Sequence, residues 1–271
     1  MRYPIRATLL LLVLMSIAPL VYGTNLNTLP PLKIIAHRGA SAYAPENTIT
    51  AFRLALDMQA DGIELDVHVS ADGKLMVIHD AHTGRTGDQH LEVRETSSHE
   101  LRTLDVGRWK GPTWKGEVMP FLEEVLDLIP LDKELFIECK TRDSDAFLNA
   151  LSDLWDKYET RLRSSTFISF HASILSALKQ ERPYLTTLLL IEDKETLEYY
   201  SDFILGSSSS PFNGAGIKAS LHIDDEWVNA MKSQSRVLSV WTVNSPKLAQ
   251  TYKEWDFHFI TTDKPDLLIS E

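Results

Sequence analysis

The sequence predicts an α/β fold in which eight parallel strands alternate with helices and close into a (β/α)8 barrel, with a hairpin and loop segment inserted after the second strand. Three observations predict it. Short apolar runs alternate with segments whose apolar residues recur at helical spacing. There are eight such runs, which favours a closed barrel over an open sheet. An open nucleotide-binding sheet, the alternative, normally carries a G-x-G-x-x-G turn after its first strand, whereas residues 39–42 are GASA.

The eight strands are predicted where short runs rich in apolar and β-branched residues occur. In chain order they are Lys33–Ala36, Gly62–Asp66, Glu134–Cys139, Thr166–Phe170, Thr186–Ile191, Ala215–Ala219, Val237–Val243 and Phe257–Thr261. Helices between them are indicated by apolar residues three and four apart, as in Ile49, Phe52 and Leu56. The order of elements is therefore that of a parallel barrel.

The region between Asp66 and Phe121 breaks this alternation, because no helical pattern follows the second strand directly. Instead the pair Asp72-Gly73, a common hairpin turn, stands between two apolar runs. A hairpin centred on this pair places His79 opposite Asp66. If the strand register slipped by one or two residues, both residues would still lie at the same end of the hairpin. The polar stretch that follows extends the insertion, at about residues 67–117, over one face of the barrel.

The composition is that of a globular protein and excludes several classes of function. The chain has 271 residues, of which 44% are hydrophobic and 24% charged, so it is neither collagen-like nor disordered. Its 27 Lys and Arg against 38 Asp and Glu give a net charge of −11, and no nucleic-acid partner is expected, because phosphate binding needs clustered cations. The single cysteine, Cys139, excludes an intrachain disulfide. The oligomeric state is left open.

Residues 1–23 have the layout of a secretory signal peptide. Arg2 and Arg6 precede an apolar run that ends near Val21, and Gly23 completes a cleavage pattern before residue 24. A spanning helix needs about 20 apolar residues. This run is shorter and contains Pro19, so an uncleaved anchor is the less favoured alternative. We expect export to the periplasm or the medium, a mature domain at residues 24–271, and no stable membrane span after cleavage.

Three carboxylates stand at the carboxyl ends of two predicted strands. Glu64 and Asp66 are two residues apart, so both point to one side of their strand, and Glu138 ends another strand. Barrel enzymes place their sites at this end of the strands, so we expect the three to converge. Their mutual repulsion would be relieved by a hard divalent cation, and oxygen ligands favour Mg²⁺ or Ca²⁺ over zinc.

Two histidines are predicted at the same end of the barrel. His37 closes the first strand, and the hairpin returns His79 to the neighbourhood of Asp66. Because the ordinary pKa of histidine is about 6.5, two such side chains can serve as an acid–base pair at neutral pH. Arg38 offers a planar fork suited to a phosphate or a carboxylate.

Three further residues have an open interpretation. Glu46 and Asn47 precede the first predicted helix, where Asn47 is a plausible N-cap, and a capping role is as well supported as a catalytic one. Trp241 ends a buried strand, so it either packs in the core or forms the wall of a substrate pocket. Cys139 alternates away from Glu138 and is expected to be buried and inert.

Seven short motifs follow one another along the chain. They are AHRGA at 36–40, PENT at 45–48, IELDV at 63–67, IHD at 78–80, IECK at 137–140, VWTVN at 240–244 and ITTDKPD at 260–266. In this order they closely resemble the glycerophosphodiester phosphodiesterase family. The resemblance extends from about Leu32 to the end of the chain, and it is far more specific than a single His-Arg-Gly motif.

The resemblance implies a TIM barrel with an insertion after its second strand. It also implies hydrolysis of glycerophosphodiesters to glycerol 3-phosphate and an alcohol, with one divalent cation, Ca²⁺ or Mg²⁺, as cofactor. The implied site residues are Glu64, Asp66 and Glu138 for the cation, His37 and His79 for general acid and base catalysis, Arg38 and Lys140 for the substrate phosphate, and Glu46 as a further candidate member. Which histidine is the acid and which the base is left open; His79 is favoured as the acid, because the hairpin brings it from the side of the insertion.

Two departures from the family pattern concern the leaving alcohol. After Asp80 the family usually shows a Leu-Asp-Arg-Thr-like run, whereas residues 81–86 are AHTGRT, and His171 stands where an acidic residue or Asn is frequent. They leave the preferred head group open.

Two alternative functions stay open. A lysophospholipase D or a phospholipase-type phosphodiesterase would need a hydrophobic lip, for which Trp109, Trp114 and Phe121 are candidates. A barrel that binds phosphate esters without turnover is disfavoured, because the set of carboxylates and histidines is intact.

Overall fold

The computed structural model of this chain describes residues 32–206 and 210–269. The predicted signal peptide at residues 1–23 lies outside the described residues, so export stays a prediction.

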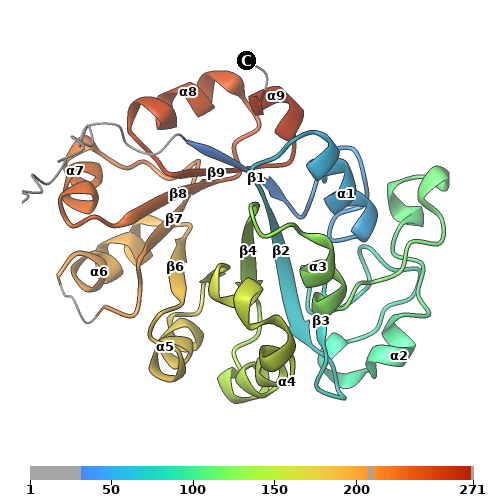
Figure 1. The fold of residues 1–271 in the computed structure, drawn as a ribbon. Helices are drawn as coiled ribbons and strands as arrows, with labels where there is room; N and C mark the ends of the chain where they lie inside the picture. Colours follow the sequence, from blue (N-terminus) through green and yellow to red (C-terminus); the bar gives the residue numbers. More distant parts are fainter. Residues whose placement is uncertain (1–31, 207–209, 270–271) are drawn as a thin grey trace, which may run out of the picture. The chain divides into compact units, whose positions relative to one another are not determined.

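Eight parallel strands close into a barrel, as predicted (Figure 1). Each barrel strand pairs in parallel with the next barrel strand along the chain, beginning with the first two. The last strand also pairs with the first, and this pairing closes the ring. The barrel strands are β1 Lys33–His37, β2 Gly62–Val69, β4 Glu134–Cys139, β5 Thr166–Ser169, β6 Thr186–Ile191, β7 Gly214–Lys218, β8 Val237–Trp241 and β9 Phe259–Thr262. All eight lie where the sequence predicts them, with ends that differ by three residues at most.

Helices connect the strands and cover the outside of the barrel (Figure 1). They are α1 Ile49–Asp57, α3 Leu122–Leu128, α4 Ser144–Arg163, α5 Ala172–Glu181, α6 Lys194–Leu205, α7 Asp225–Ser233, α8 Pro246–Glu254 and α9 Pro265–Ile269. Their apolar faces pack on the outward side chains of the strands, which form the largest buried cluster. Within residues 32–206 and 210–269, no helix is both long and apolar enough to cross a membrane.

The strands divide their side chains between two environments because side chains alternate along a strand. On β4, Leu135, Ile137 and Cys139 point outward into the layer beneath the helices, where the single cysteine is buried as predicted. Phe136 belongs instead to a separate inner cluster. That cluster fills the barrel interior with Ile35, Phe136, Ile168, Leu188 and Leu190. Polar residues that continue the inner register therefore emerge at the mouth of the barrel.

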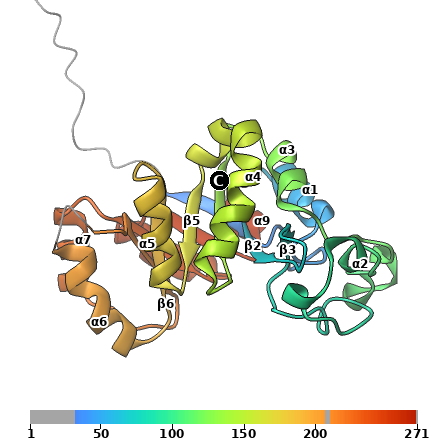
Figure 2. The ribbon, with the colours of Figure 1, turned by 90° about the horizontal axis from the view of Figure 1, so that it is seen from below.

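The inserted segment lies between β2 and α3 and stands beside α1 and α3 in both views (Figures 1 and 2). It contains the short strand β3 Leu75–Val77, the helix α2 Ser98–Leu101, and three single turns of 3-10 helix: η1 Val93–Glu95, η2 Arg108–Lys110 and η3 Pro112–Trp114. It has a buried cluster of its own, to which Met76, Val93 and Leu101 contribute. This cluster gives the segment a fixed structure from which it can position His79.

The hairpin of β2 and β3 forms as predicted, but the predicted register is wrong by one residue. Val67 pairs with Val77 and Val69 with Leu75, so Ile78 and not His79 lies opposite Asp66. The reason is the turn: Ser70 N–H donates to the carbonyl of Lys74, which closes a loop of three residues instead of two. Gly73 takes the positive φ of 76° that this loop requires.

The turn of the hairpin is fastened to α2 by Asp72. Its carboxylate accepts hydrogen bonds from the Ser70 hydroxyl at 2.7 Å and from the backbone N–H and the hydroxyl of Ser98 at 2.8 and 2.7 Å. Burial opposes the charge, but these donors outweigh it and lower the pKa of Asp72 to about 2. The ionised carboxylate therefore stabilises the junction between the hairpin and the rest of the insertion.

We expect Asp72→Asn to lower the free energy of unfolding at pH 7 by about 1 kcal/mol, the typical value of a hydrogen bond. Because the pKa in the folded state lies below the unfolded value of about 3.9, the stabilisation is complete above that value and is lost as the pH falls towards 2. Urea unfolding between pH 7 and pH 2.5 should therefore show the difference between parent and variant shrinking below pH 4. Asp153→Asn on the exposed face of α4 is the control. A difference that stays constant down to pH 2.5 would contradict this role.

Candidate active site

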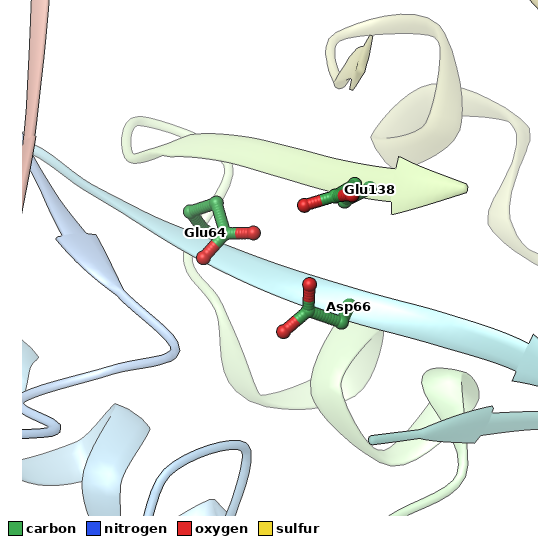
Figure 3. Close-up of side chains that lie close together, drawn as sticks. All are labelled: Glu64, Asp66 and Glu138. Atoms are coloured by element: carbon green, nitrogen blue, oxygen red, sulfur yellow. The ribbon is translucent and has the colours of Figure 1, made fainter. Parts of the chain in front are cut away.

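Glu64, Asp66 and Glu138 converge at the mouth of the barrel, as predicted (Figure 3). One carboxylate oxygen of each lies within 4.8 Å of those of the other two. The strands explain the placement: Glu64 and Asp66 share the inner face of β2, and Asp66 pairs in register with Glu138 of β4. The three residues are only 2%, 0% and 6% exposed.

The cluster is electrostatically strained. Burial, and then repulsion from Asp66 and Glu138, raises the pKa of Glu64 well above its ordinary value. Burial and repulsion from Asp66 likewise raise the pKa of Glu138 to about 8. The pKa of Asp66 is lowered although burial opposes it, because Arg38 and Lys140 lie beside its carboxylate. Burial and mutual repulsion therefore oppose the negative charge of Glu64 and Glu138, whereas Arg38 and Lys140 stabilise that of Asp66.

A divalent cation fits this set of ligands. Oδ1 of Asp66 is buried and accepts no hydrogen bond, and Lys140 Nζ lies 3.5 Å from it. The donor atoms are all carboxylate oxygens, which suit Ca²⁺ or Mg²⁺ better than softer metals. A cation placed among them would remove the repulsion that raises the two glutamate pKa values.

Arg38 and Lys140 join the carboxylates to a cavity of about 350 Å³ that both residues line. Lys140 continues the inner register of β4 beyond Glu138 and donates to a Glu138 oxygen at 2.8 Å. Arg38 Nε lies 3.1 Å from Asp66, and its backbone N–H donates to Glu64 at 2.9 Å. Burial opposes both charges, but the carboxylates raise the pKa of Arg38 and of Lys140. Both side chains therefore present fixed positive charge to the cavity.

His37 ends β1 and lies beside the carboxylate cluster, with its Nε2 4.0 Å from Glu64. Its Nδ1 lies 2.6 Å from Asp263, whose carboxylate also accepts from the Ser41 hydroxyl and the Asn244 amide. Although burial opposes the charge, these partners lower the pKa of Asp263. The contact with Asp263 orients the ring through Nδ1, and Nε2 is the nitrogen that lies near Glu64.

His79 lines the same cavity, in spite of the shifted hairpin register. Its Nδ1 lies 2.6 Å from Asp80, which Arg85 binds in turn through Nε at 2.8 Å. Burial is opposed by Arg85 and His79, and the pKa of Asp80 falls to about 2. Burial lowers the pKa of His79 itself, and the nearby Asp66 acts against this. Each histidine of the pair is thus oriented by its own carboxylate.

Glu46 is linked to the carboxylate cluster through Arg38, which contacts both Glu46 and Asp66. Its carboxylate accepts from Arg38 at 2.9 Å and from both terminal nitrogens of Arg85 at 2.7 and 2.8 Å. These arginines lower its pKa against the effect of burial. Glu46 therefore acts on the site through Arg38 and Arg85.

Of the two interpretations left open for Asn47, the N-cap role is wrong. Thr48 caps α1 by accepting from Ala51 N–H, while Asn47 is buried and donates its amide to Asp66 at 2.7 Å. The backbone explains the difference, because Asn47 takes a positive φ of 58°, outside the extended region that an N-cap adopts. Asn47 thus belongs to the site as a partner of Asp66.

Trp241 lies in the wall of the cavity, so the structure favours the second of its two interpretations. Its indole N–H donates to the carbonyl of Gly216 at 3.0 Å, and its ring meets Phe170 edge to face. The residues predicted as a hydrophobic lip, Trp109, Trp114 and Phe121, are absent from the described residues that line this cavity. Phe121 instead packs beneath the guanidinium of Arg102.

Sequence reasoning missed three residues that complete the site. Asp263 contacts His37 from 226 positions further along the chain through the closure of the barrel, Asn244 donates to Asp263, and Arg85 contacts Glu46 from the insertion. Asp263 and Asn244 belong to the motifs ITTDKPD and VWTVN, and each closely follows a predicted strand. A position just after a strand of the barrel is the pattern that could have indicated a site residue.

Comparisons with known proteins identify the family to which this chain belongs. The glycerophosphoryl diester phosphodiesterase family matches residues 37–267. A glycerophosphodiester phosphodiesterase of Bacillus subtilis is 31% identical over 269 residues, which cover 93% of this chain and 90% of the relative. The structure of a glycerophosphodiester phosphodiesterase from Agrobacterium tumefaciens superposes with a TM-score of 0.74 at 28% identity, covering 88% of this chain and 98% of that one.

A phosphodiesterase from Oleispira antarctica, solved with the product sn-glycerol-3-phosphate, has a TM-score of 0.77 at 26% identity and covers 89% of this chain and 95% of its own. The family match spans most of the chain and includes every residue of the cluster and both histidines. The chain therefore belongs to the glycerophosphoryl diester phosphodiesterase family.

Proposed function

We propose that this enzyme hydrolyses glycerophosphodiesters to glycerol 3-phosphate and an alcohol, with one Ca²⁺ or Mg²⁺ ion and with His37 and His79 as the acid–base pair. One observation carries the proposal: three buried carboxylates and two carboxylate-oriented histidines stand beside a single cavity. The related structure with bound sn-glycerol-3-phosphate supports this choice of product.

Glu64, Asp66 and Glu138 would hold the cation, and Asn47 would orient Asp66 through its amide. When bound, a divalent cation supplies Lewis-acid stabilisation of the negative charge on a phosphodiester. Arg38 and Lys140 add two positive charges at the wall of the cavity, where they bind and orient the phosphate. Glu46 is a positioning residue in this scheme, since it holds Arg38.

The histidines move the protons. Because Nδ1 of each ring is tied to a carboxylate, Nε2 of each is left for the reacting oxygens. One Nε2 accepts the proton of the nucleophile, a water or the neighbouring glycerol hydroxyl, as its oxygen bonds to phosphorus. The other Nε2 donates a proton to the oxygen of the leaving alcohol as its bond to phosphorus breaks. When the glycerol hydroxyl is the nucleophile, this step leaves a cyclic phosphate, which a water must then open to give glycerol 3-phosphate. Such assistance contributes about 10²–10⁴-fold to the rate.

Removal of the cation tests the carboxylate cluster. We expect dialysis against EDTA to abolish release of glycerol 3-phosphate from glycerophosphocholine, and Ca²⁺ or Mg²⁺ to restore it. The same ion should raise the thermal unfolding temperature, because a ligand present at 100 times its Kd stabilises by about 2.7 kcal/mol.

Glu138→Gln should lose both effects of the metal. Glu100→Gln, an exposed carboxylate of α2, should keep both and serves as the matched control. Full activity of the parent enzyme in excess EDTA would refute a metal-dependent reaction.

Replacing either histidine with Ala should cost kcat about 10²-fold or more, equivalent to about 2.7 kcal/mol of transition-state stabilisation. Folding and the metal-induced rise in unfolding temperature should persist, because neither ring is a proposed ligand of the cation. The losses should not add in the double variant, since the pair acts as a unit. A nitrophenyl phosphodiester, whose leaving group needs no proton, should rescue only the variant that lacks the acid, which we assign as His79→Ala.

His99→Ala, on the exposed side of α2, is the control and should behave as the parent. Near-normal rates of both His37→Ala and His79→Ala on glycerophosphocholine would show that the acid–base assignment is wrong.

We also propose that the chain is exported and cleaved before Thr24, on the basis of the charged and apolar pattern of residues 1–23. Native protein isolated from outside the cytoplasm should give an N-terminal sequence that starts near Thr24. Cytoplasmic protein that retains Met1 would exclude this route.

A further inference from the structure

The insertion carries a basic and aromatic segment that the proposed chemistry does not use. Residues 106–116, which we call the basic loop, read VGRWKGPTWKG and contain three basic side chains, two tryptophans and no acidic residue. The basic residues are Arg108, Lys110 and Lys115. Because the whole chain has a net charge of −11, the basic loop is a local reversal of its charge.

The basic loop has a fixed conformation. It is formed mainly by the turns η2 and η3, which backbone hydrogen bonds close, as from Lys110 N–H to the carbonyl of Gly107 at 3.0 Å. Asp105 ties the two turns together, because its carboxylate accepts from the backbone N–H of Arg108 and of Gly116, each at 3.0 Å. The loop therefore needs little ordering before it binds a partner.

The exposed side chains of this region are cationic and apolar. Arg108 and Lys115 are exposed and form no ion pair within the part of the chain that the structure describes. Trp109 is 39% exposed, and its indole N–H already donates to the carbonyl of Val106 at 2.9 Å. Val118, just after the loop, is 42% exposed. The free surface therefore consists of apolar carbon beside unpaired positive charges.

The basic loop lies against the end of the barrel that carries the active site. Lys110 Nζ donates to the carbonyl of Ser41 at 2.6 Å, in the segment that joins β1 to α1. The insertion stands beside α1, into which this segment leads (Figure 1). The hydroxyl of Ser41 donates to Asp263, the partner of His37, and the nearby Tyr43 is 37% exposed. A surface that met the basic loop would therefore lie near the mouth of the barrel.

This combination of side chains matches a phospholipid bilayer that contains anionic lipids. Such a surface attracts lysine and arginine electrostatically. Tryptophan gathers at the boundary between lipid headgroups and hydrocarbon, where its ring contacts both. An acidic protein would satisfy the cations but would leave the exposed carbon of Trp109 and Val118 in water, so the apolar part of the surface favours a membrane.

We propose that the basic loop docks this protein on the surface of bilayers that contain anionic phospholipids. Arg108 and Lys115 bind the lipid phosphates, and Trp109 places its ring among the headgroups. Lys110 holds the loop on the barrel through Ser41. The contact is peripheral and reversible, because a few cations and one indole bury much less apolar surface than a spanning helix. The inference goes beyond the proposed function and does not depend on the reaction at the active site.

Co-sedimentation of the full chain with vesicles tests this docking surface. Arg108→Gln/Lys115→Gln should weaken binding to vesicles of equal parts phosphatidylcholine and phosphatidylglycerol about 25-fold, that is about fivefold for each cation removed. Arg163→Gln/Lys253→Gln is the matched control and should bind as the parent, because these exposed residues end α4 and α8 at the opposite end of the barrel. Residues 1–23 are the same in every variant, so they cannot produce these differences.

Quenching of tryptophan fluorescence by lipids with brominated acyl chains locates the contact. The parent should be quenched more strongly than Trp109→Phe, and an unchanged thermal unfolding temperature would show that each variant is folded. Equal vesicle binding by the parent and Arg108→Gln/Lys115→Gln, or equal quenching of the parent and Trp109→Phe, would overturn the docking surface. Parent protein that binds pure phosphatidylcholine as tightly as the anionic vesicles would refute the electrostatic basis, and no binding to either would exclude a membrane partner.

Discussion

The repulsion among three buried carboxylates is the constraint on which the rest of the site depends. Glu64, Asp66 and Glu138 are held together by the register of β2 and β4, so the backbone prevents them from moving apart. Arg38 and Lys140 supply two positive charges against three potential negative ones. The repulsion that remains would be relieved by a small cation, which the three carboxylates could bind.

The two sides of the cavity are lined by different kinds of side chain. Strands β1, β2 and β4 carry the charged groups and His37, and the insertion adds His79 with its partner Asp80. Strands β5 to β8 contribute an apolar and aromatic wall that ends in Glu192. Because all of these side chains follow the inner register of rigid strands, or loops that are fastened to them, the two halves are fixed relative to each other before substrate enters.

The sequence was sufficient wherever the relevant geometry was local. Period-two alternation placed Glu64 beside Asp66, and the eight apolar runs identified the barrel strands. It failed where geometry depended on a detail of the backbone: the three-residue turn at Gly73 shifted the hairpin register, and the positive φ of Asn47 moved the helix cap to Thr48. The partnership of His37 with Asp263 spans 226 positions, and although the position of Asp263 after the last strand was a signal, only the pairing of that strand with the first brings the two residues together.

The most direct test of the central claim is a crystal structure grown with Mn²⁺ and examined by anomalous scattering, because Mn²⁺ occupies the same oxygen-ligand sites as Mg²⁺ and Ca²⁺. The account predicts one strong peak at coordination distance from a carboxylate oxygen of each of Glu64, Asp66 and Glu138, with the Lys140 ammonium displaced from Glu138. A structure in which Lys140 still contacts Glu138 and the anomalous signal lies elsewhere would contradict it.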